Sequence, residues 1–419
     1  MIKVFKFGGF AVSDTGSVKN LVKIVSEYSD DQILIIVSAM GKTTDALEKL
    51  CKSYVEGNED AQDILKKIKQ FHENIMLELF GTKDHPVFDE IANTFVEIEW
   101  MLEDEPHPDY DFNYDQIVSV GEFLSSRIVA AYLNENNIDT RWMDARDFIH
   151  TDNTYREGII DMDKTRSSMS VLNSALKKQT VVTQGFIGGT SENFSTTLGR
   201  EGSDYSAAIF ASLLNAESLT VWKDVPGIMN ADPRLFASAQ KYDELPYSEA
   251  LEMAYYGATV IHPKTIKPLQ NAGVPLFVRP FLLPDEKGTR IDSTAKLNTD
   301  ISAIIVKQNQ MLLSISSKDF SFIDEHILIY LLQCISEAHI KLNMMQRSAL
   351  SLSFCFNQDE AKFRKLYDIL KDKFKCKYNE CLDLITVRHF KREELETITA
   401  GRTIIMEQFS RNTAQIILQ

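Results

Sequence analysis

The chain has 419 residues, of which 44% are hydrophobic and 25% are charged, and its formal net charge is −15 at pH 7. This length suits two or three domains, and this composition is typical of a soluble globular protein. The acidic balance argues against a protein that binds nucleic acid or anionic membranes.

The sequence carries no sign of export or of a metal centre. No apolar run reaches the ~18–20 residues of a membrane span, and the first residues form a strand pattern in place of a basic-then-apolar signal. The five cysteines show no C-x-x-C spacing, and the histidines and cysteines show no metal-ligand spacing. We therefore expect a cytoplasmic protein with reduced thiols and no metal site of its own.

The first 110 residues predict a strand, a helix, a strand and then a long helical segment. Residues 2–9 (IKVFKFGG) predict a strand, residues 17–28 a helix, and residues 32–40 a buried parallel strand. Residues 46–110 have the apolar spacing of helices, and Glu103–Asp111 predict an exposed loop.

Strand patterns alternate with helix patterns as far as residue 224. Residues 114–133 predict a strand, a turn and a helix, and TRWMDA, TVVTQGFIG and SLTVWKD predict further strands. Such alternation predicts a mostly parallel sheet with helices on both faces, which binds ligands at the carboxyl ends of its strands. These positions fall at such ends: Lys6, Ser38, Gly121–Glu122, Gly185–Gly189 and Asp224. We therefore expect one active site there.

The pattern changes near Gly288–Arg290. Residues from about 301 predict the order βαββαβ of a ferredoxin-like fold, followed by a helix near Glu393–Ala400 and two strands. We expect an α/β domain over 1–297 with a helical insertion over 46–110. An α+β region follows over 298–419, whose second unit is truncated.

The loop LGREGSD, within residues 197–207, joins two glycines to an arginine, a serine and an aspartate just before an apolar helix. Gly199 and Gly202 allow the backbone to approach a ligand, and Arg200 can grip a carboxylate with its planar fork. Asp204 lies where the helix starts, so it can cap that helix or organise a metal–phosphate site. The plainer alternative is a capped turn.

Two other motifs suit phosphate chemistry, and a third that resembles a phosphate loop does not. Lys6-Phe7-Gly8-Gly9 places a cation and bare amides at a strand end, as phosphoryl transfer requires. The GKT at residues 41–43 is not a P-loop, because Ile36 stands where that loop needs glycine. Residues 222–234 (WKDVPGIMNADPR) can hold a nucleotide, or can be a Pro-Gly turn followed by a capped turn.

Together KFGG, LGREGSD and W-x-DVPG…DPR resemble the aspartokinases of the amino acid kinase family, over essentially the whole chain. The resemblance implies ATP-dependent phosphorylation of the β-carboxylate of L-aspartate to 4-phospho-L-aspartate, the first step of lysine, threonine and methionine biosynthesis. Mg²⁺ would arrive with ATP. The C-terminal region resembles paired ACT domains, which implies a lysine or threonine effector and a homodimer or homotetramer. Since the sequence ends at Gln419, we expect no fused homoserine dehydrogenase.

The resemblance also implies a role for each site residue. Catalytic roles fall on Lys6 and Asp204. Aspartate would contact Thr44, Glu122, Phe186, Arg200 and Ser203. The nucleotide would contact Gly8, Gly9, Ser38, Lys223, Asp224, Arg234 and Lys264. The effector would contact Asn343 and Gln346. We further expect Lys6 to face solvent and His262 to be structural.

The sequence departs from the family pattern at four places. Phe10-Ala11 replaces Thr-Ser, Glu201 replaces a glycine, and Met229-Asn230-Ala231 replaces Tyr-Thr-Thr. Thr259 replaces a lysine, whose charge Lys264 could supply. These departures leave open a catalytically inactive, effector-sensing regulator, or a kinase for another small carboxylate substrate. The retained residues Lys6, Glu122, Arg200 and Asp204 favour the aspartate kinase.

Overall fold

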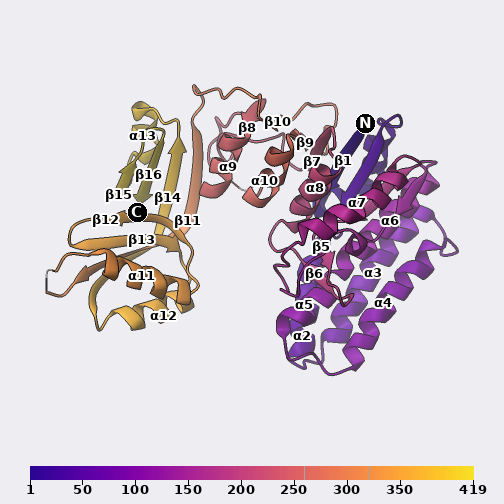
Figure 1. Ribbon diagram of the computed structural model, residues 1–419, viewed down its shortest axis with the longest axis horizontal. Coiled ribbons are helices and arrows are strands. Elements are labelled where there is room, and N and C mark those ends of the chain that lie inside the picture. The colour runs from indigo at the N-terminus through magenta and orange to yellow at the C-terminus, as the bar shows by residue number, and fades with distance from the viewer. Residues whose placement is uncertain (259, 320) are drawn as a thin grey trace. The chain divides into compact units, whose positions relative to one another are not determined.

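The computed structural model describes residues 1–258, 260–319 and 321–419, so Thr259 lies outside the described residues. The chain divides into two compact units (Figure 1). The first unit comprises Met1–Ile228, Lys241–Leu251 and Val260–Leu297. The second unit comprises Met229–Gln240, Glu252–Thr259 and Asn298–Gln419.

A mostly parallel sheet forms the centre of the first unit, as the sequence predicts. Among the described residues it has eight strands in the order β3-β4-β2-β1-β7-β9-β10-β8. Their bounds are β1 Ile2–Phe7, β2 Gln32–Val37, β3 Thr140–Trp142, β4 Thr180–Gln184, β7 Ser218–Lys223, β8 Glu244–Pro246, β9 Leu276–Pro280 and β10 Thr289–Asp292. Of these pairings, β9 with β10 is antiparallel.

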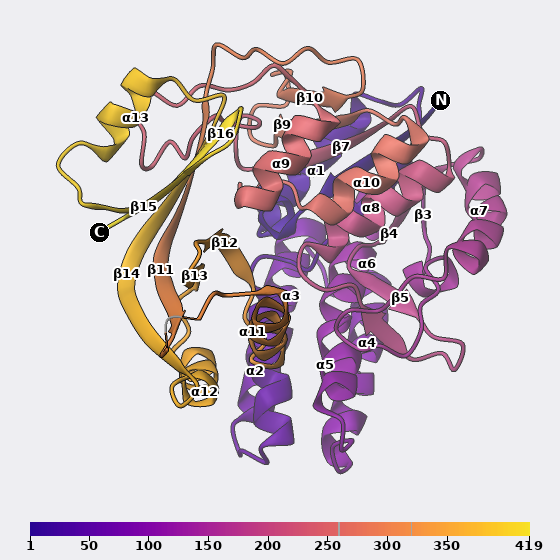
Figure 2. The same ribbon diagram turned by 60° about the vertical axis from the view of Figure 1, so that its left-hand side comes forward.

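Helices cover both faces of the sheet (Figure 2). One face packs Phe5, Phe7 and Ile35 against α1 (Thr15–Ser26) and α6 (Val120–Glu135). The other face contacts α7 (Met162–Leu176) and α8 (Gly202–Leu213), and α8 packs on α10 (Pro263–Ala272). Because side chains alternate along a strand, Lys6 points to the face opposite Phe5 and Phe7. This alternation brings Lys6 to the start of α8.

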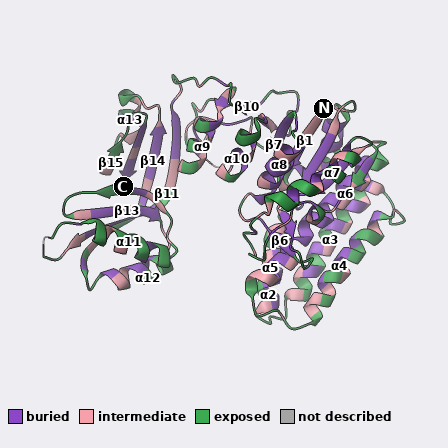
Figure 3. Cartoon of the chain, viewed as in Figure 1, coloured by how far each residue is buried: buried purple, intermediate pink, exposed green. Residues whose placement is uncertain are grey.

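The segment expected as a helical insertion over 46–110 contains helices, and the helical region extends beyond it at both ends. Its helices are α2 Thr43–Val55, α3 Ala61–Phe80, α4 Val87–Glu103 and α5 Tyr110–Val118. The predicted loop lies between α4 and α5. The apolar residues of α2, α3 and α4 join the same core as α1 and α6, so the insertion extends the core of the first unit (Figure 3).

The strand predicted near residues 114–120 was wrong. Residues 110–118 form α5, and Gly121 with Glu122 lies in the first turn of α6 and not at a strand end. Tyr114, Ile117 and Val118 follow the i, i+3, i+4 period of a helix and are buried. Gly121 is not a turn glycine: a Cβ there would lie 2.9 Å from the Cβ of Ala39. The glycine allows α6 to pack closely on the loop after β2.

A small hairpin, two 3₁₀ turns and part of one helix complete the first unit. The hairpin strands β5 (Ile187–Gly189) and β6 (Ser195–Thr197) lead directly into the LGREGSD loop. The 3₁₀ turns η1 and η2 span Gly9–Val12 and Ala145–Asp147, and α9 spans Tyr247–Tyr256 across both units.

The second unit has the ferredoxin-like order that the sequence predicts, followed by a smaller addition. Among its described residues six strands form an antiparallel sheet in the order β12-β13-β11-β14-β16-β15. Its elements are β11 Ala303–Ser317, α11 Glu325–Glu337, β12 Leu342–Arg347, β13 Ser351–Asn357, α12 Glu360–Leu370, β14 Phe374–Arg388, α13 Arg392–Thr399, β15 Ile404–Phe409 and β16 Thr413–Leu418.

The two long strands of this sheet take part in two separate hydrophobic cores. β11 and β14 have 15 residues each, and their pairing shifts register between Lys307 and Gln310. Helices α11 and α12 cover the β11–β13 half, whereas α13 packs on Ile304, Ile385 and Ile416 in the other half. Within the described residues no helix is long and apolar enough to cross a membrane.

Candidate active site

One buried carboxylate holds two lysines at the carboxyl ends of β1 and β7. The carboxylate oxygens of Asp204 lie 2.6 Å from Lys6 Nζ and 2.9 Å from Lys223 Nζ. In the parallel register Lys6 lies opposite Val221, so Lys223 projects from the same face one pleat further along. Lys6 is only 7% exposed, so the expectation that it faces solvent was wrong. We call these three residues the lysine–aspartate triad.

The charges of the triad stabilise one another. Burial alone would raise the pKa of Asp204, but the charges of Lys6 and Lys223 lower it to about 2. Burial lowers the pKa of Lys6, and the charge of Asp204 opposes that effect. Burial also acts on Lys223, but there Asp204 outweighs it and the pKa is raised. With Asp204 ionised, the two ammonium groups leave a net positive site, which suits an anion.

A cavity of about 830 Å³ opens beside the triad. It brings together residues far apart in the sequence, from β1, the loop after β2, α2, α6, the turn after β4 and the start of α8. The predicted residues that line it are Lys6, Ser38, Thr44, Glu122, Phe186, Arg200, Ser203, Asp204 and Lys223.

Glu122 is the buried acid of this cavity, and the residue is only 2% exposed. Its Oε1 accepts a long hydrogen bond of 3.3 Å from the backbone N–H of Ala39. Its Oε2 has no hydrogen-bond partner among the described residues. Burial raises the pKa of Glu122 to about 8. A buried acid with an unmatched oxygen suits a bound cationic group.

Close backbone contacts shape the wall opposite Glu122. A Cβ at Gly185 would lie 2.6 Å from the Cβ of Ser203, and one at Gly202 would lie 2.7 Å from Phe186 Cδ2. Phe186 itself has a left-handed backbone, with φ 68°. The glycines of GFIGG and GREGSD therefore let the turn after β4 and the start of α8 touch, which fixes Phe186 at the cavity wall.

The glycines after Lys6 serve the same kind of packing. A Cβ at Gly9 would lie 2.9 Å from the carbonyl oxygens of Ala39 and Gly41. Gly8 has an extended backbone and begins the turn η1. Phe10 and Ala11 follow, where the family pattern has Thr-Ser. Phe10 packs its ring edge-on against Phe281 and is 44% exposed, whereas Ala11 is buried in the core.

Asp115 was missed by the sequence analysis, although it supports the site. Its carboxylate is fully buried and accepts hydrogen bonds from Thr197 N and Oγ1 and from Arg156 N, at 2.7–2.9 Å. Burial raises the pKa of Asp115 to about 6. This carboxylate ties α5 to β6, the strand that leads into the LGREGSD loop. A strand was expected around residue 115, so a buried helical carboxylate was not considered.

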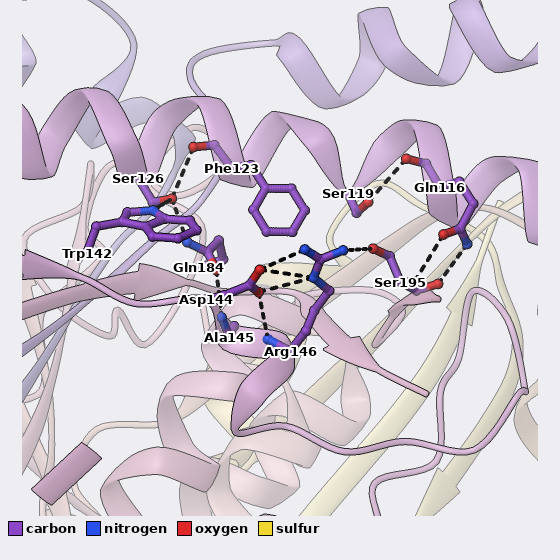
Figure 4. Close-up of polar contacts among 10 residues, drawn as sticks. All are labelled: Gln116, Ser119, Phe123, Ser126, Trp142, Asp144, Ala145, Arg146, Gln184 and Ser195. Carbon is purple, nitrogen blue, oxygen red and sulfur yellow. Dashed lines mark hydrogen bonds and ion pairs between the residues drawn. The ribbon is translucent and has the colours of Figure 1, made fainter. Parts of the chain in front are cut away.

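A second polar network holds the hairpin against α5 and α6 (Figure 4). The side chain of Gln116 donates to Ser195 O and accepts from Ser195 N, at 2.9 and 3.0 Å. Arg146 donates to Ser195 Oγ and forms an ion pair with Asp144, and its guanidinium lies over the ring of Phe123. The hairpin is thereby fixed from both sides.

Other missed residues line the far side of the cavity. They come from α2, α5 and the loop before Gly158: Glu48, Asp111, Tyr114, Thr154, Tyr155, Arg156 and Glu157. Tyr114 donates a hydrogen bond of 2.6 Å to Glu48, and Arg156 stacks on the Tyr114 ring. These residues stand outside the motifs, and α2, α5 and the loop before Gly158 bring them to the cavity.

Five predicted nucleotide residues do not line this cavity: Gly8, Gly9 and three charged residues. Asp224 follows β7 and is exposed, and Lys264 is exposed in the first turn of α10. Arg234 belongs to the second unit, where it pairs with Asp232 at 2.7 Å. His262 is the N-cap residue of α10 and accepts from Lys264 N, as expected of a structural residue.

The two predicted effector residues differ in their surroundings. The side chain of Asn343 accepts from Lys307 and donates to Gln310 and Asn357, at 2.7–2.8 Å. Gln346, nearer the end of β12, is exposed. Of the two, Gln346 is the more exposed side chain.

The raised pKa of Glu122 predicts how the free energy of unfolding changes with pH. The folded chain holds the Glu122 proton up to about pH 8, whereas an unfolded chain releases it near 4.5. Between these values the folded state binds more protons, so the free energy of unfolding falls as the pH rises. Relative to Glu122→Gln, the wild type should lose on the order of 4 kcal/mol between pH 5 and 9.

Tryptophan fluorescence during urea unfolding measures this change in the first unit, which contains Trp100, Trp142 and Trp222. Equal pH dependence in the two proteins would contradict a raised pKa at Glu122.

The geometry agrees with comparisons to known proteins. Residues 1–280 match the amino acid kinase family. Lysine-sensitive aspartokinase 3 of Escherichia coli is 31% identical over 320 residues, which cover 75% of this chain and 70% of that protein. The bifunctional aspartokinase/homoserine dehydrogenase of Daucus carota is 28% identical over 389 residues, which cover 90% of this chain. The chain spans only 42% of the length of that relative.

Solved structures extend the similarity to both units. E. coli aspartokinase III in complex with aspartate and ADP (R-state) superimposes with a TM-score of 0.85 at 26% identity, covering 100% of this chain and 96% of that one. The complex of the same protein with lysine and aspartate (T-state) gives 0.82 at 26% identity, covering 99% and 95%. The chain therefore belongs to the amino acid kinase family, and within it to the aspartokinases.

Proposed function

We propose that the chain transfers the γ-phosphoryl group of ATP to the β-carboxylate of L-aspartate and forms 4-phospho-L-aspartate. The observation that carries this proposal is the lysine–aspartate triad at the strand ends, facing a cavity that also holds Glu122 and Arg200. The triad suits the charge of transferring phosphoryl oxygens. Glu122 and Arg200 suit the two charged groups of an amino acid.

The chemistry needs positioning more than proton transfer. The acceptor carboxylate is already ionised at neutral pH, so no general base is required. Lys6 and Lys223 neutralise the charge of the moving phosphoryl group, while Asp204 keeps both ammonium groups in place. The amides near Gly8 and Gly9 add donors at the same strand end. Such pre-oriented charges stabilise a transition state without reorganisation.

Glu122 and Arg200 would orient aspartate. The α-ammonium group of aspartate supplies the cation that the unmatched Oε2 of Glu122 lacks, so binding favours the ionised acid. Arg200 is exposed and has no hydrogen bond or ion pair among the described residues, so its fork is open to a carboxylate. Thr44, Phe186 and Ser203 line the same space and would complete the aspartate pocket.

ATP would enter with Mg²⁺, and its phosphates would lie near Lys6, Lys223 and Ser38. Asp224, Lys264 and Arg234 stay predictions for the remaining nucleotide contacts. E. coli aspartokinase III, the relative with an ADP complex, supports nucleotide use. The inactive regulator that the sequence left open is less favoured, because the departures at Phe10 and Ala11 leave the triad intact.

The two units would correspond to a catalytic domain and an ACT-like regulatory region, with a boundary near residue 297. Lysine-sensitive aspartokinase 3 of E. coli and the lysine complex of E. coli aspartokinase III support an amino-acid effector. We propose lysine or threonine as effector, with Gln346 in contact. A homodimer or homotetramer and a cytoplasmic location stay predictions from the sequence.

Lys6→Ala should lower kcat roughly 10²–10³-fold, because one preorganised charge of the phosphoryl site is lost. Asp204 keeps Lys223 as its partner, so the variant should remain folded, although less stable than a surface-lysine variant. Lys3→Ala is the matched control: Lys3 lies on the same strand but pairs with Asp31 at the other end. Coupled ADP release measures kcat. A normal kcat in Lys6→Ala contradicts the assignment.

Arg200→Lys should raise the KM for aspartate more than the KM for ATP, because a planar fork becomes a point charge. Arg156→Lys is the comparison, since Arg156 lines the same cavity but already pairs with Asp111. Initial rates at varied aspartate and varied ATP separate the two constants. If Arg156→Lys, and not Arg200→Lys, raises the KM for aspartate, the carboxylate site lies on the other wall.

Millimolar lysine or threonine should shift the apparent affinity for aspartate or ATP, through a coupling of about 1–3 kcal/mol. Gln346→Ala should weaken that shift and leave the uninhibited rate unchanged, because Gln346 lies in the second unit. Activity and thermal stability are measured over a titration of each amino acid. If neither responds, the second unit does not sense these effectors.

A further inference from the structure

Glu201 lies in the LGREGSD loop, where the family pattern has glycine. It is the N-cap residue of α8 and has a left-handed backbone, with φ 55° and ψ 28°. That conformation suits glycine and costs a residue with a Cβ roughly 1–2 kcal/mol. The backbone role of Glu201 would therefore be served better by glycine.

The side chain lies in the cavity of the lysine–aspartate triad. Glu201 lines that cavity with Lys6, Lys223 and Asp204. Its Oε2 is buried and has no hydrogen-bond partner among the described residues. Both lysines act on its charge electrostatically, yet among the described residues neither forms an ion pair with it. The chain thus places an unmatched carboxylate oxygen beside the phosphate-binding lysines.

Asp204 is less suited than Glu201 to bind a metal ion, because both of its carboxylate oxygens are in ion pairs. One oxygen of Asp204 holds Lys6 and the other holds Lys223. A metal ion on Asp204 would have to displace one of these ammonium groups. Mg²⁺ in nucleotide sites is bound by one or two carboxylates together with phosphate oxygens and waters. Both oxygens of Asp204 are in ion pairs with lysines, whereas Oε2 of Glu201 has neither an ion pair nor a hydrogen bond among the described residues.

We propose that Glu201 is a protein ligand of the Mg²⁺ that accompanies the nucleotide, and that its carboxylate would supply a ligand in addition to the phosphate oxygens. Without the ion, the same carboxylate repels those phosphates. Glu201 would thereby make nucleotide binding depend on the metal. This inference rests on the proposed nucleotide site, and it concerns a residue that the family pattern does not supply.

Equilibrium binding of ADP, with and without Mg²⁺, tests the inference in the full-length chain. The wild type should bind ADP much more tightly with Mg²⁺ than without it. Glu201→Gln should reduce this Mg²⁺ effect about tenfold, through both tighter metal-free binding and weaker binding with metal, as expected when one charge near the phosphates is removed. Glu201→Gly, which relieves the left-handed strain, should behave like Glu201→Gln.

Glu157→Gln is the matched control, because Glu157 is an exposed carboxylate of the same cavity that contacts Gly199. It should keep the wild-type Mg²⁺ effect. Mn²⁺ paramagnetism gives a direct readout of the metal: the affinity for Mn²⁺ in the presence of ADP should fall in both Glu201 variants and stay unchanged in Glu157→Gln.

An unchanged Mg²⁺ effect in the Glu201 variants would overturn the inference. So would tighter ADP binding by the same factor with and without metal, since Glu201 would then only repel the nucleotide. These outcomes leave the proposed function intact if the wild type still phosphorylates aspartate. If the wild type binds no ADP even with Mg²⁺, both proposals fail.

Discussion

The sharing of one buried carboxylate by two lysines is the interaction on which the rest of the site depends. Burying two ammonium groups is costly, and Asp204 offsets that cost by accepting Lys6 on one oxygen and Lys223 on the other. The register of the parallel strands supplies the geometry: Lys6 and Lys223 leave the same face at adjacent strand ends, and α8 begins directly opposite. The sheet thus prepares a cationic site before any ligand arrives.

The surrounding cavity contains features that destabilise the unliganded fold and that suit a bound ligand. Glu122 is buried, and its Oε2 has no hydrogen-bond partner among the described residues. Its raised pKa shows that burial disfavours the charged carboxylate. Glu201 adds a strained backbone at the start of α8. Strain and unmatched charge of this kind persist where a ligand completes them. Hydrogen bonds from Thr197 to Asp115 and from Ser195 to Gln116 hold the strand that leads into the LGREGSD loop in place.

Much of this arrangement could be predicted from local patterns. Buried strands, the helix after LGREGSD and the ferredoxin-like order follow from apolar periodicity and capping residues, which are local properties. The burial of Lys6 could not be predicted, because it depends on the start of α8, almost 200 residues later. The strand expected near residue 115 was wrong because Gly121 resembled a turn, whereas it permits close packing of α6 on Ala39. The far wall of the cavity depends on how α2, α5 and the loop before Gly158 fold, and no motif marks these segments.

The central claim is that the triad transfers a phosphoryl group to aspartate. Trapping the acyl phosphate with hydroxylamine, in the presence of ATP, Mg²⁺ and aspartate, tests it most directly, with Asp204→Asn as the comparison. The account predicts an aspartyl hydroxamate formed in step with ADP by the wild type. It predicts at least a 10²-fold slower reaction in a folded Asp204→Asn protein, in which both lysines lose their anchor. ADP release without hydroxamate, or a variant as active as the wild type, would contradict the account.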